Sequence, residues 1–212
     1  MTDAMSRRLA IGVFGLIVVL GAAGFVLKGR ATADDVFGIP FFAFAAVGAV
    51  VAARQPRNPV GWIFMVVGLT PTAGFFTGAY AGTSLQTPGG LPAGTFVEWV
   101  SSWAWFPGIG LLATFGFLLF PNGKLPSRRW RLLPYVAAVW IAVITASMAL
   151  LPGPMEPFDP TLPSSVNPSG LESAGEVIQS VEGVAFSGFP LLALLCVASL
   201  GFRYRNASSE QR

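Results

Sequence analysis

Basic residues in this chain are confined almost entirely to every second connection between long apolar stretches. Six such stretches lie at residues 9–27, 36–53, 60–82, 96–120, 132–151 and 184–202. Each is close to the roughly 20 residues that an α-helix needs to cross the hydrocarbon core of a bilayer. The pattern predicts an all-α integral membrane protein, with residues 1–212 forming one domain that is a bundle of six transmembrane helices.

The distribution of the basic residues also predicts an orientation. If the N-terminus lies in the cytoplasm, the outer segments hold only Lys28 and Arg30, and eight of the ten acidic residues are outside. Eleven basic residues are then inside: Arg7, Arg8, Arg54, Arg57, Lys124, Arg128, Arg129, Arg131, Arg203, Arg205 and Arg212. Because Lys and Arg are retained on the cytoplasmic side, we expect both termini inside.

Composition agrees with a membrane protein. Charged residues are 11% of the chain and hydrophobic residues 53%, whereas soluble domains contain about 25% charged residues. The net charge of +3 is concentrated at the inner face, where anionic lipid headgroups are sufficient partners, and no nucleic-acid partner is predicted. The single cysteine, Cys196, lies inside the sixth stretch, which excludes an intrachain disulfide and favours a packing role.

The start of the chain has an alternative interpretation as a secretory signal peptide. Arg7 and Arg8 precede an apolar run, and Ala31-Thr-Ala33 resembles a cleavage site. The run is 19 residues long, whereas the apolar part of a signal peptide has roughly 7–15. Lys28 and Arg30 also lie between that run and the Ala-x-Ala sequence. We therefore expect a retained first helix.

The inner connections contain turn signals together with most of the basic residues. Pro56 and Pro59 disfavour helix in the residues before them, so a helix must end and reverse there. Asn122-Gly123 is typical of a turn with positive φ. The basic residues of these connections are expected at the level of the lipid phosphates rather than in a catalytic site; they are Arg54, Arg57, Lys124, Arg128, Arg129 and Arg131.

The fifth connection, residues 152–183, is the longest outer loop. Its first half is rich in proline and is expected to be irregular. Ser169 and Glu172 have the spacing of a capping box. Apolar residues then recur at helical spacing as far as Val181. The pattern predicts a short amphipathic helix on the outer surface, separate from the last span.

Several kinds of chemistry are excluded by what the sequence lacks. The chain contains no histidine and no Walker-type glycine loop, which excludes a His nucleophile, a His metal cluster and a P-loop. Paired acidic residues deep in a span, which proton and ion relays usually need, do not occur either. We therefore predict no catalytic residue, no cofactor and no metal, and we expect that these residues do not form an enzyme.

Glu98 is the only acidic residue within a predicted span, and three tryptophans follow it closely. It lies near the outer end of the fourth stretch, beside Trp99, Trp103 and Trp105. One interpretation is a carboxylate at headgroup depth beneath a belt of interfacial aromatic residues. The other is a sensing site in which the rings supply apolar area and Glu98 fixes a cation or a hydrogen-bond donor. Trp140 lies near mid-span and faces either lipid or the bundle.

Glycine and proline mark two further features. Gly74, Gly78 and Gly82 form a double small-xxx-small pattern, which allows close approach between helices. The pattern serves packing within the monomer or, alternatively, a homodimer face. Pro107 and Gly110 bound the segment most favourable for a kink, which is either a relay hinge or a tolerated irregularity.

The connections resemble the N-terminal membrane region of actinobacterial sensor histidine kinases. The likeness is carried by Arg54–Trp62 (RQPRNPVGW), Leu119–Arg131 (LFPNGKLPSRRWR), Asn167–Leu171 (NPSGL) and the basic exit Phe202–Arg205 (FRYR). These are loop signatures rather than catalytic motifs. The resemblance implies a sensor-type membrane region in a bacterial cytoplasmic membrane, and it assigns kinase activity to no residue of this chain.

The expected function is the sensory or anchoring membrane part of a two-component signalling system, with a kinase or a response regulator as partner. A stimulus at the outer side would shift helix packing, and the inner loops would transmit that shift. A small transporter or channel component is the alternative, which buried charges or an inverted repeat would favour. A nonfunctional truncated fragment is a third interpretation.

Overall fold

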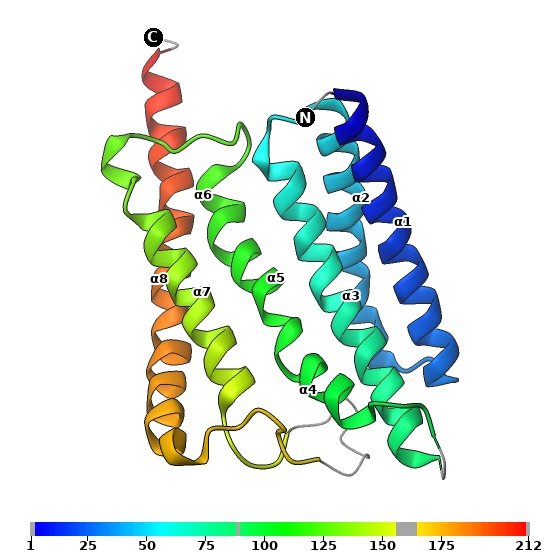
Figure 1. The fold of residues 1–212 in the computed structure, drawn as a ribbon. Helices are drawn as coiled ribbons and strands as arrows, with labels where there is room; N and C mark the ends of the chain where they lie inside the picture. Colours follow the sequence, from blue (N-terminus) through cyan, green and yellow to red (C-terminus); the bar gives the residue numbers. More distant parts are fainter. Residues whose placement is uncertain (1–2, 88–89, 156–164, 211–212) are drawn as a thin grey trace.

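The protein is a bundle of long helices (Figure 1), described here from a computed structural model. The described residues are 3–87, 90–155 and 165–210. Within them, six helical segments are long and apolar enough to cross a membrane. The prediction of an all-helical protein with six candidate spans is therefore confirmed.

Successive spans cross the bundle in opposite directions (Figure 1). In order, the helices are α1 (Asp3–Lys28), α2 (Gly38–Arg54), α3 (Pro59–Gln86), α4 (Gly94–Ala104), α5 (Phe106–Leu111), α6 (Phe117–Leu119), α7 (Leu133–Leu150) and α8 (Gly175–Glu210). Short 3₁₀ turns lie at Ala33–Phe37, Arg128–Trp130 and Glu172–Ala174. Helices α4, α5 and α6 together make the fourth span.

The two ends of the bundle differ in their connections. One end, at the top of Figure 1, holds the α2–α3 and α6–α7 connections and the last turns of α8. We call it the cationic end, because Arg54, Arg57, Lys124, Arg128, Arg129, Arg131 and Arg203 lie in these segments. The opposite end, called the far end, holds the α1–α2, α3–α4 and α7–α8 connections.

The α2–α3 connection forms as the prolines predict. Helix α2 ends at Arg54, and Pro59 is the first residue of α3. A proline is tolerated there because the first helical N–H has no intrahelical acceptor to bond. The side chain of Asn58 caps α3 by accepting a hydrogen bond from the Val60 N–H at 3.1 Å.

Helices α2 and α3 pack closely through glycine. A Cβ atom at Gly68 would lie 2.4 Å from the Cβ of Ala45, and one at Gly61 would lie 2.6 Å from the backbone nitrogen of Ala52. Side chains at these positions would push the helices apart, so glycine sets their separation.

The expected separate helix before the last span is not found. Residues 175–183 instead continue into the last span as the single helix α8. Gly183 and Gly188 do not interrupt it, and Pro190 lies within it. The apolar spacing was real, but Val177 and Val184 on this helix are 66% and 73% exposed, which fits an extended lipid-facing surface of one long helix.

The fourth span is the most irregular. Its α-helical pattern is broken at Trp105 and again by a π-helical turn at Leu112–Gly116. Pro107 lies in the first turn of α5, where it costs no hydrogen bond. The glycines that follow have a packing role: a Cβ at Gly108 would lie within 3.3 Å of the Val67 carbonyl oxygen of α3, and one at Gly110 within 2.8 Å of Ile141 of α7.

An aromatic core joins the fourth span to α7 and α8. Phe106 is 2% exposed, and its ring centroid lies 5.4 Å from that of Phe186 and 5.5 Å from that of Phe189. Trp140 faces the bundle, because its indole N–H donates to the Ala185 carbonyl at 2.8 Å. Cys196 of α8 is free and fully buried.

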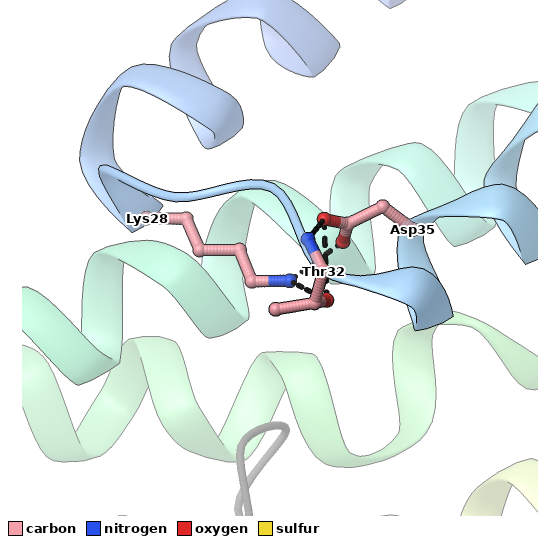
Figure 2. Close-up of polar contacts among 3 residues, drawn as sticks. All are labelled: Lys28, Thr32 and Asp35. Carbon is pink, nitrogen blue, oxygen red and sulfur yellow. Dashed lines mark hydrogen bonds and ion pairs between the residues drawn. The ribbon is translucent and has the colours of Figure 1, made fainter.

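The α1–α2 connection is closed by a compact ion pair (Figure 2). Lys28 Nζ lies 2.6 Å from Asp35 Oδ1 and donates to Thr32 Oγ1 at 2.9 Å. The Thr32 N–H donates to Asp35 Oδ2 at 2.7 Å. The side chains of Lys28 and Asp35 are only 14% and 11% exposed. The first hairpin therefore carries its own charge compensation at the far end.

Candidate functional site

Glu98 is buried within the helix bundle. It is 2% exposed, and both of its carboxylate oxygens lack a hydrogen-bond partner. Gly94, Glu98 and Ser101 are the buried positions of α4. Their spacing of four and three residues places them on one face of the helix. The carboxylate therefore belongs to the interior face of the fourth span.

That face of α4 packs antiparallel to α3. Near the far end, a Cβ at Gly94 would overlap the side chain of Ser84. Further along, a Cβ at Gly74 would lie 3.4 Å from the Cβ of Trp105. Glu98 is on the segment between these two contacts. Gly78 and Gly82 are also buried on α3, so the glycine stripe lies within the bundle rather than on an open dimer face.

The three tryptophans near Glu98 are half-buried and differ in their polar contacts. Trp99 donates its indole N–H to the Ala149 carbonyl of α7 at 2.8 Å, and Trp105 donates to the Ser102 carbonyl at 3.0 Å. The Trp103 indole nitrogen is buried without a partner. The rings of Trp99 and Trp103 pack edge to face with centroids 5.5 Å apart. Trp99 thus bonds protein rather than lipid headgroups.

The surroundings of Glu98 limit its chemistry. Burial of a carboxylate without a hydrogen-bond donor is costly, and a cation or a donor group beside it would offset that cost. Among the described residues, no cluster of three His, Cys, Asp or Glu could hold a metal ion. The arrangement offers two buried carboxylate oxygens to one small cationic or hydrogen-bond-donating group.

At the cationic end, the turn that follows α6 contacts the α2–α3 connection. Gly123 has the predicted positive φ, at +72°, and a Cβ there would lie 2.4 Å from Pro59. Asn58 Nδ2 donates to the Pro121 carbonyl at 3.2 Å. The tight turn sequence therefore serves a contact between two connections that are far apart in the chain.

Arg203 of α8 joins the same turn. Its guanidinium donates to Asn122 Oδ1 at 3.1 Å and to the Leu118 carbonyl at 2.9 Å, and it also bonds the Lys124 carbonyl. The bond to Leu118 supplies a donor to a carbonyl at the end of α6, where helical carbonyls have no partner within the helix. The last helix is thereby fastened to the end of the fourth span.

The remaining basic residues of the cationic end are on its surface. Their side chains are exposed; they are Arg54, Arg57, Lys124, Arg128, Arg129 and Arg131. Exposed cations beside apolar helices are suited to contact with anionic headgroups.

Two side chains make contacts that their sequence context does not predict. Arg203 belongs to the basic exit of the last stretch, and Asn167 begins the NPSGL segment of the fifth connection. Asn167 is 7% exposed, and its amide donates to the carbonyls of Ala149 and Leu151 at the end of α7. A single Asn in a proline-rich loop is a weak signal, because its partners are defined only by the fold.

Comparison with protein-family models, with curated proteins and with solved structures finds no match to this chain.

Proposed function

We propose that the chain is the sensory or anchoring membrane region of a bacterial two-component signalling system. In this proposal it lies in the cytoplasmic membrane with the cationic end inside, as the excess of basic residues at that end favours. Its partners are anionic headgroups at the inner face and a kinase or response regulator in the cytoplasm.

The proposal is supported by one continuous series of contacts. Glu98 and the tryptophans lie at the far end of the fourth span, and Arg203 contacts the Leu118 carbonyl at its other end. A helix that carries a buried, unpartnered carboxylate at one end is therefore joined at the other to the helix that leaves the bundle. A change in packing around Glu98 has a direct route to α8.

The middle of the fourth span is irregular, and this is the part of the helix that could change conformation between Glu98 and α8. The break at Trp105 and the π-helical turn at Leu112–Gly116 lie between the two ends. π-Helical turns inside α-helices occur often at functional sites. A ligand or stimulus that stabilises one arrangement of this segment shifts the population toward it.

The test is to join the chain to the dimerisation and kinase parts of a related sensor and to measure autophosphorylation in membranes. Glu98→Gln, Trp103→Ala and Pro107→Ala should each alter the stimulated output at unchanged abundance. Val139→Ala, at a position 63% exposed on α7, is the matched control and should signal normally. Normal signalling by all three variants would refute the sensing role of this segment.

A small transporter or channel component is the second candidate, and the burial of Glu98 favours it. Buried ionisable groups in membrane helices often line ion or proton pathways. Proteoliposomes containing the chain would show ion or proton flux that Glu98→Gln abolishes and Val139→Ala leaves unchanged. Absence of flux in the unmodified protein would remove this candidate without affecting the sensory one.

A further inference from the structure

An open depression of about 680 Å³ lies at the cationic end, between the α2–α3 connection and the turn after α6. Both connections line it with polar or turn residues; these are Gln55, Pro56, Arg57, Asn58, Pro121, Asn122 and Lys124. The depression is separate from the Glu98 region, which lies toward the far end.

The charge of this depression is of one sign. Arg57 and Lys124 lie on its two sides, and both are exposed. Within the described structure, neither side chain takes part in an ion pair or a hydrogen bond. Residues 54–60 and 118–131 include no Asp or Glu. Helix α3 also begins here, at Pro59, and the positive end of its dipole adds to the potential.

The two walls are held in fixed positions. Asn58 Nδ2 crosses between them by donating to the Pro121 carbonyl at 3.2 Å, and it also donates to Gln55 Oε1 of its own connection at 3.2 Å. Gly123 packs on Pro59, and Arg203 holds Asn122 from behind through a bond of 3.1 Å. The backbones that carry Arg57 and Lys124 are therefore held in place before an anion binds, and binding costs little conformational entropy of the two connections.

We infer that this depression binds the phosphate of an anionic lipid headgroup. A phosphate supplies oxygens for both cations, and the guanidinium of Arg57 suits paired hydrogen bonds to it. The lipid source is favoured by position, because the depression opens where α2 ends and α3 begins. Trp62, which donates to the Pro56 carbonyl at 3.0 Å, is a residue type enriched at the membrane interface.

The inference requires neither the sensory role nor an assignment of the cell side. Basic loops attract anionic lipids in general, and that diffuse effect would depend only on the total charge of the cationic end. The inference is more specific, because it assigns the binding of the lipid to Arg57 and Lys124 among the exposed cations.

The test uses the full chain in mild detergent, with retained lipid counted by native mass spectrometry. Phosphatidic acid should be retained over phosphatidylcholine. The double variant Arg57→Gln/Lys124→Gln should weaken this retention by about thirtyfold, at about fivefold for each cation removed. Arg57→Lys keeps the charge, and it should retain more lipid than Arg57→Gln.

The matched control is Arg128→Gln/Arg129→Gln, which removes the same charge from exposed positions outside the depression. It should reduce retention much less than the Arg57/Lys124 double variant does, because neither Arg128 nor Arg129 lines the depression. Equal losses in the two double variants would overturn the inference in favour of diffuse charge. Displacement of the lipid by millimolar inorganic phosphate as readily as by a second phospholipid would also overturn it, because the site would then prefer a soluble anion.

Discussion

Trp99 and Asn167 donate hydrogen bonds to the same acceptor, the carbonyl oxygen of Ala149, at 2.8 Å and 3.0 Å. This carbonyl lies in the last turn of α7, where helical carbonyls lack partners within the helix. One residue comes from α4 and the other from the connection to α8. The shared oxygen therefore fastens three segments together at the far end.

Asn167→Ala should destabilise the bundle. The substitution removes three hydrogen bonds: two that the amide donates to the Ala149 and Leu151 carbonyls, and one that Oδ1 accepts from the Ser169 N–H. Each is worth about 1 kcal/mol. We expect the free energy of unfolding in detergent to fall by about 3 kcal/mol, measured by denaturant titration. Gln86→Ala, at an exposed position at the end of α3, should have little effect. Equal stability of the two variants would contradict the structural role of Asn167.

Glycine-to-alanine substitutions should lower stability where the glycine lies against another helix and should not do so where no atom is near. Gly68→Ala places a methyl group 2.4 Å from the Cβ of Ala45, so α2 and α3 must shift, at a cost of about 1–3 kcal/mol. Gly12→Ala is the control, because nothing lies within 4 Å of its Cβ position, and it should be neutral or stabilising. Thermal denaturation of the two purified variants makes the comparison.

The Lys28–Asp35 pair predicts rescue by charge exchange. Asp35→Lys sets two ammonium groups against each other in a largely buried place, and should cost at least about 2 kcal/mol of stability. Lys28→Asp should also be destabilising, because it sets two carboxylates against each other there. The double exchange Lys28→Asp/Asp35→Lys restores opposite charges and should recover part of the loss. A double variant as unstable as the sum of the singles would show that the two side chains do not interact.

The proposed orientation can be tested with an impermeant thiol reagent in intact cells. In a Cys196→Ala background, Cys at Gln86 should be labelled, because α3 ends there at the far end. A Cys at Gln55, at the cationic end, should be labelled only after the membrane is opened. Both positions are exposed, so access depends on membrane side alone. The reverse labelling pattern would overturn the proposed orientation.

The six candidate spans could be predicted from sequence because the bilayer imposes a length and a polarity on each one. The two turns at the cationic end were also predictable, since Pro59 and Gly123 restrict the backbone locally. Such features depend on neighbouring residues in the chain, and one sequence is enough to identify them.

The burial of Glu98 and the partners of Arg203 could not be predicted in this way. Both depend on which faces of distant helices meet, and the regular apolar composition of membrane spans gives little information on faces. The continuation of residues 175–183 into α8 was missed for a related reason. The capping-box spacing of Ser169 and Glu172 and the apolar spacing as far as Val181 indicate a helix, but they do not show that it continues into the next apolar stretch.

The π-helical turn at Leu112–Gly116 gives the fourth span a way to couple movement along its axis to rotation about that axis. An α-helix advances by about 100° and 1.5 Å for each residue. A π-helical turn contains one extra residue, so moving it one position along the span would rotate the residue that it passes by about that angle. A shift past Leu118 would turn the carbonyl that Arg203 holds, and α8 would be drawn along its axis or released from the turn.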